Sequence, residues 1–155
     1  MIDRRNAIAG IVLSASALVG IIMHEGYSDT AIIPVPGDVA TIGFGTTGGV
    51  KMGDRITPPK AVARALTDIQ KFEGAVKQCV KVPLTQYEYD SAISISYNIG
   101  TTAFCNSTMV KKLNAGDYQG FCDGMLQWNK FKGQPLRGLT LRRQRERAVC
   151  LGLVS

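Results

Sequence analysis

The chain has 155 residues, which is enough for one domain with its own core or for two small lobes that share a helix. Hydrophobic residues make up 45% of it, an ordinary share for a globular protein, so most of the chain is not embedded in a membrane. Eighteen Lys and Arg against twelve Asp and Glu give a net charge of +6. This excess favours an anionic partner, such as nucleic acid, a membrane surface or an acidic cell-wall polymer, and a merely solubilising surface is the equal alternative.

A basic start followed by an apolar run opens the chain. Arg4 and Arg5 precede Ala7 to Met23, an uncharged and mostly apolar run that is rich in Ala, Gly and Ser. This order is typical of an export signal, but the run is short for a permanent span, which needs roughly 20 residues. We expect an uncleaved weak anchor that later leaves the membrane, because its small residues allow close packing against protein. A signal peptide cleaved near "SASA" and a permanent anchor are the alternatives.

The next segments predict a small β element and then helices. Residues 31–47 are dense in Pro and Gly, and "VATIGFG" is expected to form a β segment after a turn at "PGD". Thr57 is a plausible N-cap for a helix of about twenty residues that begins at Pro58, because apolar residues then recur at helical spacing. "TQYE" at Thr85 is a capping box, and the apolar helix after it stops at Gly100.

The C-terminal part is predicted to be helical throughout. One helix starts near Ser107 and ends at "NAG", and another runs from Asp117 toward Trp128. "KGQPLRG" is expected to be a loop, after which Thr140 caps the last helix. The order of elements predicts an α+β architecture with an N-terminal helix, a small β lobe and a helical lobe.

Four cysteines bear on the compartment and on metal binding. Cys79, Cys105, Cys122 and Cys150 form no C-x-x-C pair, and the single His24 is far away, so we expect no structural zinc. If the chain is exported, two disulfides are the better interpretation, with four buried thiols as the alternative. Three pairings are possible, and the order of elements favours local closure, Cys79 with Cys105 and Cys122 with Cys150.

Glu25 is the candidate catalytic acid. It ends the apolar run, and the only other acids between it and the end of the β segment are Asp29 and Asp38. A carboxyl at a helix end with apolar side chains behind it keeps its proton more readily, because desolvation disfavours the charged form. Such an acid can protonate a leaving group, as glycoside hydrolysis requires, together with a second group that places water. The hydroxyl of Thr41 could orient that water.

Several spaced motifs resemble one known family. "HEG" and "TIGFG" are followed by "PLTQYEYDSAISISYNIGTTAFCNSTMVKKLNAGDY", "QWNK" and "GLTLRRQRERAVCLG", so the resemblance covers essentially all of residues 20–152. This order is similar to that of the phage-type lysozymes, the muramidases of bacteriophage endolysins. The weak anchor further resembles the signal-arrest-release (SAR) endolysins, which are exported in an inactive tethered form and freed when the membrane loses its potential.

The resemblance implies a mainly helical, lysozyme-like α+β fold with an active-site cleft between its lobes. Residues 1–23 would be the signal anchor and residues 24–155 the catalytic domain, with a small β lobe at 24–56 and a helical lobe at 57–155. The implied activity is hydrolysis of the β-1,4 bond between N-acetylmuramic acid and N-acetylglucosamine in peptidoglycan. A monomer without cofactor, metal or nucleic acid would be tethered to the host inner membrane through residues 7–23 and then released to the host periplasm.

The family's catalytic pattern is E-x8-D-x5-T. Glu25 matches its glutamate and Thr41 its threonine, but the aspartate has no match. Pro34 and Val35 occupy the two possible positions, because the spacing from Glu25 to Thr41 is one residue longer than the pattern gives. We expect Asp38 to supply the carboxylate from a new position, and its alternative role is that of a turn former in "PGD".

Two departures from the pattern keep other functions open. The family's usual histidine after "GxG" is replaced by Thr46, and the aspartate is missing. A lytic transglycosylase needs an acid but no water-activating carboxylate, because the sugar's own hydroxyl closes a ring, so it is the alternative enzyme. A non-catalytic wall-binding module would suit the basic last helix, but Glu25 and Thr41 argue against it.

Overall fold

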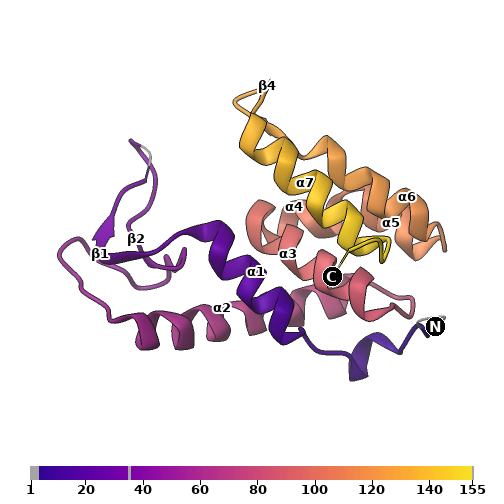
Figure 1. The fold of residues 1–155 in the computed structure, drawn as a ribbon, viewed down its shortest axis with the longest axis horizontal. Coiled ribbons are helices and arrows are strands. Elements are labelled where there is room, and N and C mark those ends of the chain that lie inside the picture. Colours follow the sequence, from indigo (N-terminus) through magenta and orange to yellow (C-terminus); the bar gives the residue numbers. More distant parts are fainter. Residues whose placement is uncertain (1–3, 35, 155) are drawn as a thin grey trace. The chain divides into compact units, whose positions relative to one another are not determined.

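The computed structural model describes residues 4–34 and 36–154, which form two compact units. One unit combines the residues up to Ala17 with those from Phe72 onward, and the other is Leu18–Lys71. We call them the helical unit and the β unit. Two helices, α1 (Ala15–Glu25) and α2 (Pro58–Cys79), each contribute residues to both units (Figure 1). The fold is α+β and mainly helical, as predicted.

The β unit contains one antiparallel pair of strands. Strand β1 (Ser28–Ile32) pairs with β2 (Thr41–Gly43), so that Ser28 lies opposite Gly43 and Ile32 opposite Thr41. Strand β2 lies inside the predicted segment "VATIGFG", and the predicted turn includes Pro36 and Gly37. Strand β1 was not predicted, because Ala31 is its only buried residue and its sequence gives little hydrophobic signal.

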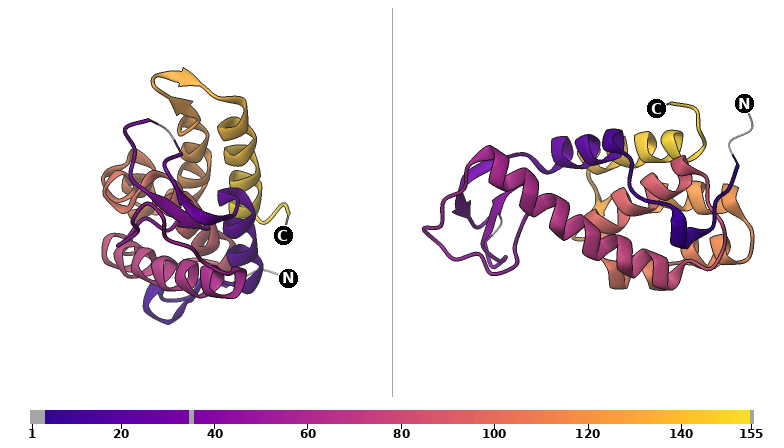
Figure 2. Two further views of the ribbon diagram at one scale, coloured as in Figure 1. Left: turned by 90° about the vertical axis from the view of Figure 1, so that its left-hand side faces the viewer. Right: turned by 90° about the horizontal axis from the view of Figure 1, so that it is seen from below.

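Helix α2, the long magenta helix in the right-hand view of Figure 2, begins at Pro58 as predicted. The missing N–H of proline costs no helical hydrogen bond at this position. Its buried face is carried by small residues at the N-terminal end, since Ala61 and Ala65 are both 1% exposed while Val62 and Leu66 are about 40% exposed. A close approach explains the alanines: a Cβ added to Gly43 would lie 3.0 Å from the Cβ of Ala61. Strand β2 therefore packs tightly on α2 within the β unit.

The helical unit is built around α3 (Gln86–Ile99), which packs against α4 and α7. The predicted capping box is present: the Thr85 hydroxyl accepts from the backbone N–H of Glu88, and the Glu88 carboxylate accepts from the N–H of Thr85. The other elements are α4 (Thr101–Asn106), α5 (Thr108–Asn114), α6 (Tyr118–Gly124), the 3-10 turn η2 (Met125–Gln127), the hairpin β3–β4 (Lys130–Phe131 and Gln134–Pro135) and α7 (Arg137–Cys150).

Two local predictions for the helical unit were wrong, and a third was right in its start but not in the type of its last turn. The "KGQPLRG" segment is not simply a loop, because its first residues form the turn of the hairpin, with Lys132 and Gly133 at positive φ, and then strand β4. Helix α7 begins before Thr140, whose hydroxyl donates to the carbonyl of Leu136 instead of capping the helix. The helix predicted from Asp117 toward Trp128 ends at Gly124 and continues as the 3-10 turn η2.

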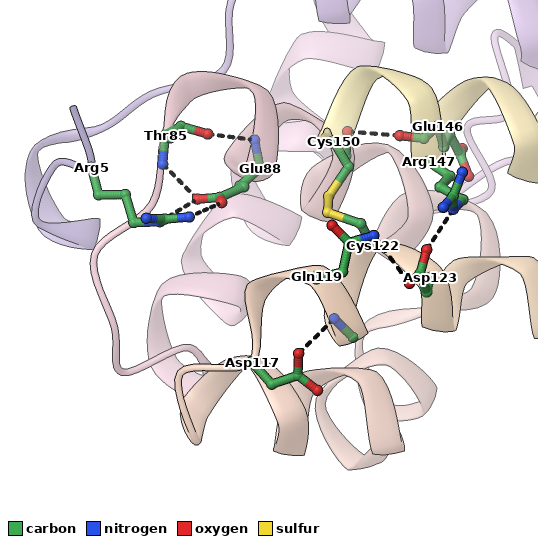
Figure 3. Close-up of a disulfide and its surroundings, with 12 residues drawn as sticks. Arg5, Thr85, Glu88, Asp117, Gln119, Cys122, Asp123, Glu146, Arg147 and Cys150 are labelled. Atoms are coloured by element: carbon green, nitrogen blue, oxygen red, sulfur yellow. Dashed lines mark hydrogen bonds and ion pairs between the residues drawn. A yellow bond between two sulfur atoms is a disulfide. The ribbon is translucent and has the colours of Figure 1, made fainter. Parts of the chain in front are cut away.

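Two disulfides have the predicted pairing. Cys79–Cys105 and Cys122–Cys150 join residues separated by 26 and 28 positions. The first ties the end of α2 to α4, and the second ties α6 to α7 (Figure 3). Both lie in the helical unit, so each restricts the unfolded chain without involving the β unit.

The apolar run at residues 7–23 is divided into three parts. A 3-10 turn, η1 (Ile8–Gly10), is followed by an irregular stretch and then by α1, which contains "ALVGIIM" and ends at Glu25 as expected. Ser14 begins α1, because its hydroxyl accepts from the N–H of Ala17. Across residues 4–34 and 36–154, no helix combines the length and apolar character that crossing a membrane requires.

Candidate active site

Glu25 is the last residue of α1 and is half-buried. Gly26 follows at a φ of 69°, a left-handed conformation that ends helices and that glycine adopts without strain. The chain then enters β1 at Ser28. The pair "EG" in the sequence thus places a carboxyl where the helix stops and the first strand begins.

The side chain of Glu25 lies directly against the backbone of Gly45. After β2 the chain makes a tight turn in which Ile42 and Thr46 exchange backbone hydrogen bonds of 2.9 and 3.1 Å. Gly45 lies in this turn at a φ of 83°, and a Cβ added there would be 3.2 Å from Oε2 of Glu25. Glycine at this position therefore meets two needs, the left-handed backbone and the room for the carboxylate.

Thr41 is the first residue of β2 and is half-buried. Its hydroxyl donates to the carbonyl of Val39 at 3.2 Å, which leaves the oxygen's lone pairs available to accept from a water molecule. Strand β2 leads from Thr41 directly into the turn of Gly45. Thr41 and the residue that contacts Glu25 therefore belong to one short strand and turn.

Asp38 is exposed, and its carboxylate accepts from the backbone N–H of Val39 at 2.8 Å. This contact is the one expected of a turn former, and a catalytic role for Asp38 stays a prediction. Asp29 is exposed on β1 and accepts from the hydroxyl of Thr30 at 3.0 Å. Of the two positions that could have held the family aspartate, Pro34 is exposed and Val35 lies outside the described residues.

Thr46 stands where the resemblance leads one to expect histidine. It is 2% exposed, and its hydroxyl donates to the carboxylate of Asp68 on α2 at 2.8 Å. The bond fixes the end of the Gly45 turn on the helix, and a buried hydroxyl needs such a partner. Sequence reasoning missed Asp68, although a carboxylate close to the buried positions Ala65 and Ile69 was a signal for it.

Two aromatic rings near the acid were also missed. The rings of Tyr27 and Phe44 are 5.2 Å apart, and the Tyr27 hydroxyl donates to the carbonyl of Ile56 at 3.0 Å. Phe44 precedes Gly45, and Tyr27 lies two residues after Glu25, so the pair connects both sides of the Glu25–Gly45 contact. Tyr27 also lines an open pocket of about 580 Å³ with Asp29 and Thr57.

The candidate proton donor of the β unit is Glu25, whose carboxylate lies against the Gly45 turn. Nowhere in the described ranges do three or more His, Cys, Asp or Glu side chains gather as metal ligands would. The half-buried carboxyl of Glu25, the hydroxyl of Thr41 and the exposed ring of Tyr27 suit proton donation to a polar, ring-shaped substrate.

Known proteins that are similar to this chain over most of its length are phage lysozymes and endolysins. The family model described as phage lysozyme matches residues 23–146. A SAR-endolysin of Pseudomonas phage phiKMV is 38% identical over 141 residues, which is 88% of this chain and 87% of that protein. Among solved structures, an endolysin from Escherichia coli O157:H7 phage FAHEc1 matches with a TM-score of 0.82 and 36% identity, covering 97% of this chain and 98% of that one.

A third relative has been solved in two states. The active form of the P1 phage endolysin matches with a TM-score of 0.79 and 26% identity over 97% of both chains. The secreted inactive form of that endolysin matches with a TM-score of 0.50 and 25% identity, covering 70% of this chain and 78% of that one. The fold described above is therefore more similar to the active form than to the inactive one.

Proposed function

We propose, from the premise that this chain belongs to the phage lysozyme family and degrades peptidoglycan, that it hydrolyses the β-1,4 bond between N-acetylmuramic acid and N-acetylglucosamine. Glu25 is the general acid of this reaction. The observation that carries the proposal is the contact of the Glu25 carboxylate with the Gly45 turn, because a catalytic acid must be held in one place to be effective.

In the proposed mechanism, Glu25 gives its proton to the glycosidic oxygen as the bond to the sugar breaks. The leaving sugar departs as an alcohol, and the remaining sugar carries positive charge in the transition state. Thr41 orients the attacking water by accepting one of its hydrogen bonds while its own hydroxyl stays bonded to Val39. Asp38 is the candidate for the carboxylate that assists the water.

One observation supports a lytic transglycosylase as the second candidate. The Asp38 carboxylate is exposed and bonded to its own turn, which is the arrangement of a residue without a catalytic part. A transglycosylase dispenses with this group, because the sugar's own hydroxyl replaces water and closes a ring. Under both candidates Glu25 is the proton donor.

Mass spectrometry of the sugar fragments released from purified peptidoglycan separates these candidates. Hydrolysis adds water and leaves reducing ends, whereas transglycosylation gives anhydro-sugars that are lighter by one water molecule. We expect reducing N-acetylmuramic acid ends. Anhydro ends would overturn the hydrolase assignment, and a folded protein that releases no sugar at all would overturn both.

We also propose that residues 7–23 first tether the enzyme, as an inactive monomer, to the host inner membrane and are later incorporated into the active fold in the periplasm. Three findings support this: the weak apolar run behind Arg4 and Arg5, the SAR-endolysin among the relatives, and the greater likeness to an active than to an inactive endolysin. The fold with α1 complete would then be that of the released form, in which α1 presents Glu25.

Collapsing the membrane potential tests the tether. We expect the uncleaved chain to move from the membrane to the soluble periplasmic fraction, with lytic activity appearing at the same time. Replacing Gly10 and Gly20 by Leu should hold the chain in the membrane, because added apolar surface favours the bilayer and an added Cβ meets nothing within 4 Å in the active fold. A soluble active form that begins near Leu18 would show that the segment is a cleaved signal peptide.

A further inference from the structure

The residues just before the apolar run are fastened to the helical unit at a defined surface. Asn6 and Leu84 form an isolated antiparallel bridge, with backbone hydrogen bonds of 2.7 and 2.9 Å in the two directions. Leu84 is fully buried and lies just before the N-cap of α3. A peptide segment that adds itself to another in this way is held by its backbone, whatever its side chains are.

Arg5 makes the more specific contacts. Its Nε and Nη2 donate to the two carboxylate oxygens of Glu88 at 3.1 and 2.8 Å, a bidentate pair (Figure 3). The guanidinium carbon lies 3.6 Å from the centre of the Tyr118 ring, within the range of a cation–π contact. Hydrogen bonding to Glu88 raises the pKa of Arg5, which favours the charged form of the guanidinium.

Glu88 is prepared to receive a cation. It is 5% exposed although it is charged, and one of its oxygens also accepts from the N–H of Thr85 in the capping box. The Tyr118 ring is fixed beside it, because the Tyr118 hydroxyl donates to the carbonyl of Pro83. With Arg5 in place Glu88 is nearly buried, and removing only the arginine leaves this carboxylate without its counter-charge. We call Leu84, Thr85, Glu88 and Tyr118 the N-terminal dock.

The segment between the dock and α1 is held along its length by polar contacts. The carbonyl of Val12 accepts from the side chain of Gln86, and the N–H of Leu13 donates to the carboxylate of Glu73. Ser14 donates through both its N–H and its hydroxyl to Asp90 on α3, at 3.0 and 2.6 Å. The segment is thus held at both of its ends, by Asn6 at the first and by Val12, Leu13 and Ser14 just before α1.

We propose that the N-terminal dock is the receptor for this chain's own residues 4–6 and that it helps to draw the segment out of the membrane. The inference rests on the proposed tether. In the tethered state Arg5 flanks the apolar run on the cytoplasmic side, where positive residues are retained, so it cannot reach Glu88 in the periplasm. The same arginine thus orients the tethered segment and, after release, fastens it.

The energetic argument concerns the difference between the two states. A switch responds only to interactions that differ between its states, and the ion pair, the ring contact and the Asn6–Leu84 bridge are all confined to the released one. Release carries Arg5 through the bilayer and costs hydrophobic burial of residues 7–23. The dock offsets part of that cost. The neighbouring bond between Ser14 and Asp90 then fixes the start of the helix that presents Glu25.

Arg4 provides a matched control for Arg5. Arg4→Ala and Arg5→Ala remove the same charge from the same flank of the apolar run, so they change membrane insertion alike. The Arg4 side chain is exposed and takes part in no ion pair within the described residues, whereas Arg5 pairs with Glu88. Glu88→Gln removes the pair from the other side, and glutamine still serves in a capping box, so α3 keeps its N-cap.

The first measurement uses the purified, soluble full-length protein. We expect Arg5→Ala and Glu88→Gln each to lower Tm by about 3–8 °C, with a smaller loss in the double variant than the sum of the two. Protease cleavage before residue 15 should become about tenfold faster in both, because the segment opens more often. Arg4→Ala should match the parent in both measurements. Equal behaviour of Arg4→Ala and Arg5→Ala would overturn the dock.

The second measurement follows release in cells after the membrane potential is collapsed. We expect Arg4→Ala to appear in the soluble fraction as the parent does, and Arg5→Ala to appear at a several-fold lower level. Equal release of the two variants would overturn the role of the dock in release. A parent chain that never associates with the membrane would instead refute the tether, and the measurements on the purified protein would still decide whether the dock exists.

Discussion

Replacing Gly45 by alanine tests how closely the acid depends on the turn after β2. Two effects follow from the geometry. The left-handed φ of 83° costs a residue with a Cβ about 1–2 kcal/mol, which lowers the free energy of unfolding by that amount. The new methyl group would also lie 3.2 Å from Oε2 and 3.6 Å from Cγ of Glu25, so the carboxylate has to shift by a few tenths of an ångström.

The second effect should dominate the activity of the Gly45→Ala variant. A displacement of about 1 Å can cost a reaction roughly 100-fold when the catalytic group must meet one atom of the substrate. A shift of a few tenths of an ångström should therefore lower peptidoglycan lysis by about 3- to 6-fold, although the protein stays folded. The assay is the loss of turbidity of Gram-negative cells whose outer membrane has been permeabilised, beside denaturant unfolding of the same samples.

Gly49 offers the control. It has a similar positive φ of 70°, but a Cβ added there would meet nothing within 4 Å. Gly49→Ala should therefore lose about 1–2 kcal/mol of stability and keep the parent's activity. The reasoning is refuted if folded Gly45→Ala lyses cells as fast as the parent, or if Gly49→Ala loses as much activity as Gly45→Ala.

Three further predictions concern the turn, the disulfides and alkaline pH. Asp38→Asn keeps an acceptor for the N–H of Val39 but removes the charge, so it should reduce lysis if Asp38 assists the water; unchanged lysis would leave it a turn residue. Reducing the two disulfides should lower the free energy of unfolding by about 2–4 kcal/mol each, and an unchanged denaturation midpoint with and without reductant would contradict this. Burial, and then a hydrogen bond to Glu73, raise the pKa of Tyr89 above its ordinary value of 10.0, so its contribution is complete below pH 10 and is lost as the pH rises further. Tyr89→Phe, which cannot ionise, should make the decline of Tm above pH 10 less steep, and an equally steep decline would argue against this role.

Local signals in the sequence predicted much of the fold. Pro58, the Thr85 capping box and Gly100 each act within a few residues of the chain, so the start of α2 and both limits of α3 could be predicted without knowledge of their neighbours. The start of α7 could not be predicted in this way, because Thr140 bonds to the carbonyl of Leu136 inside the helix, where the sequence suggested a cap. The hairpin β3–β4 was not predicted either. A Ser or Thr near a helix start can serve in either way.

The same distinction applies to the candidate site. Glu25 was identifiable because an isolated acid ends an apolar run, and that is a local property. Its contact with Gly45 and the bond between Thr46 and Asp68 depend on how β2 meets α1 and α2, which no local pattern states. The pairing of Arg5 with Glu88 joins residues 83 positions apart and was equally out of reach.

The turnover of a purified Glu25→Gln variant tests the central claim most directly. Glutamine keeps the size of the side chain and can still lie against Gly45, but it has no proton to donate to the glycosidic oxygen. The account predicts that the release of sugar fragments falls by about 10²–10⁴-fold or more while the unfolding transition stays within about 1 kcal/mol of the parent. A folded Glu25→Gln protein that releases fragments at a substantial fraction of the parent's rate would contradict it.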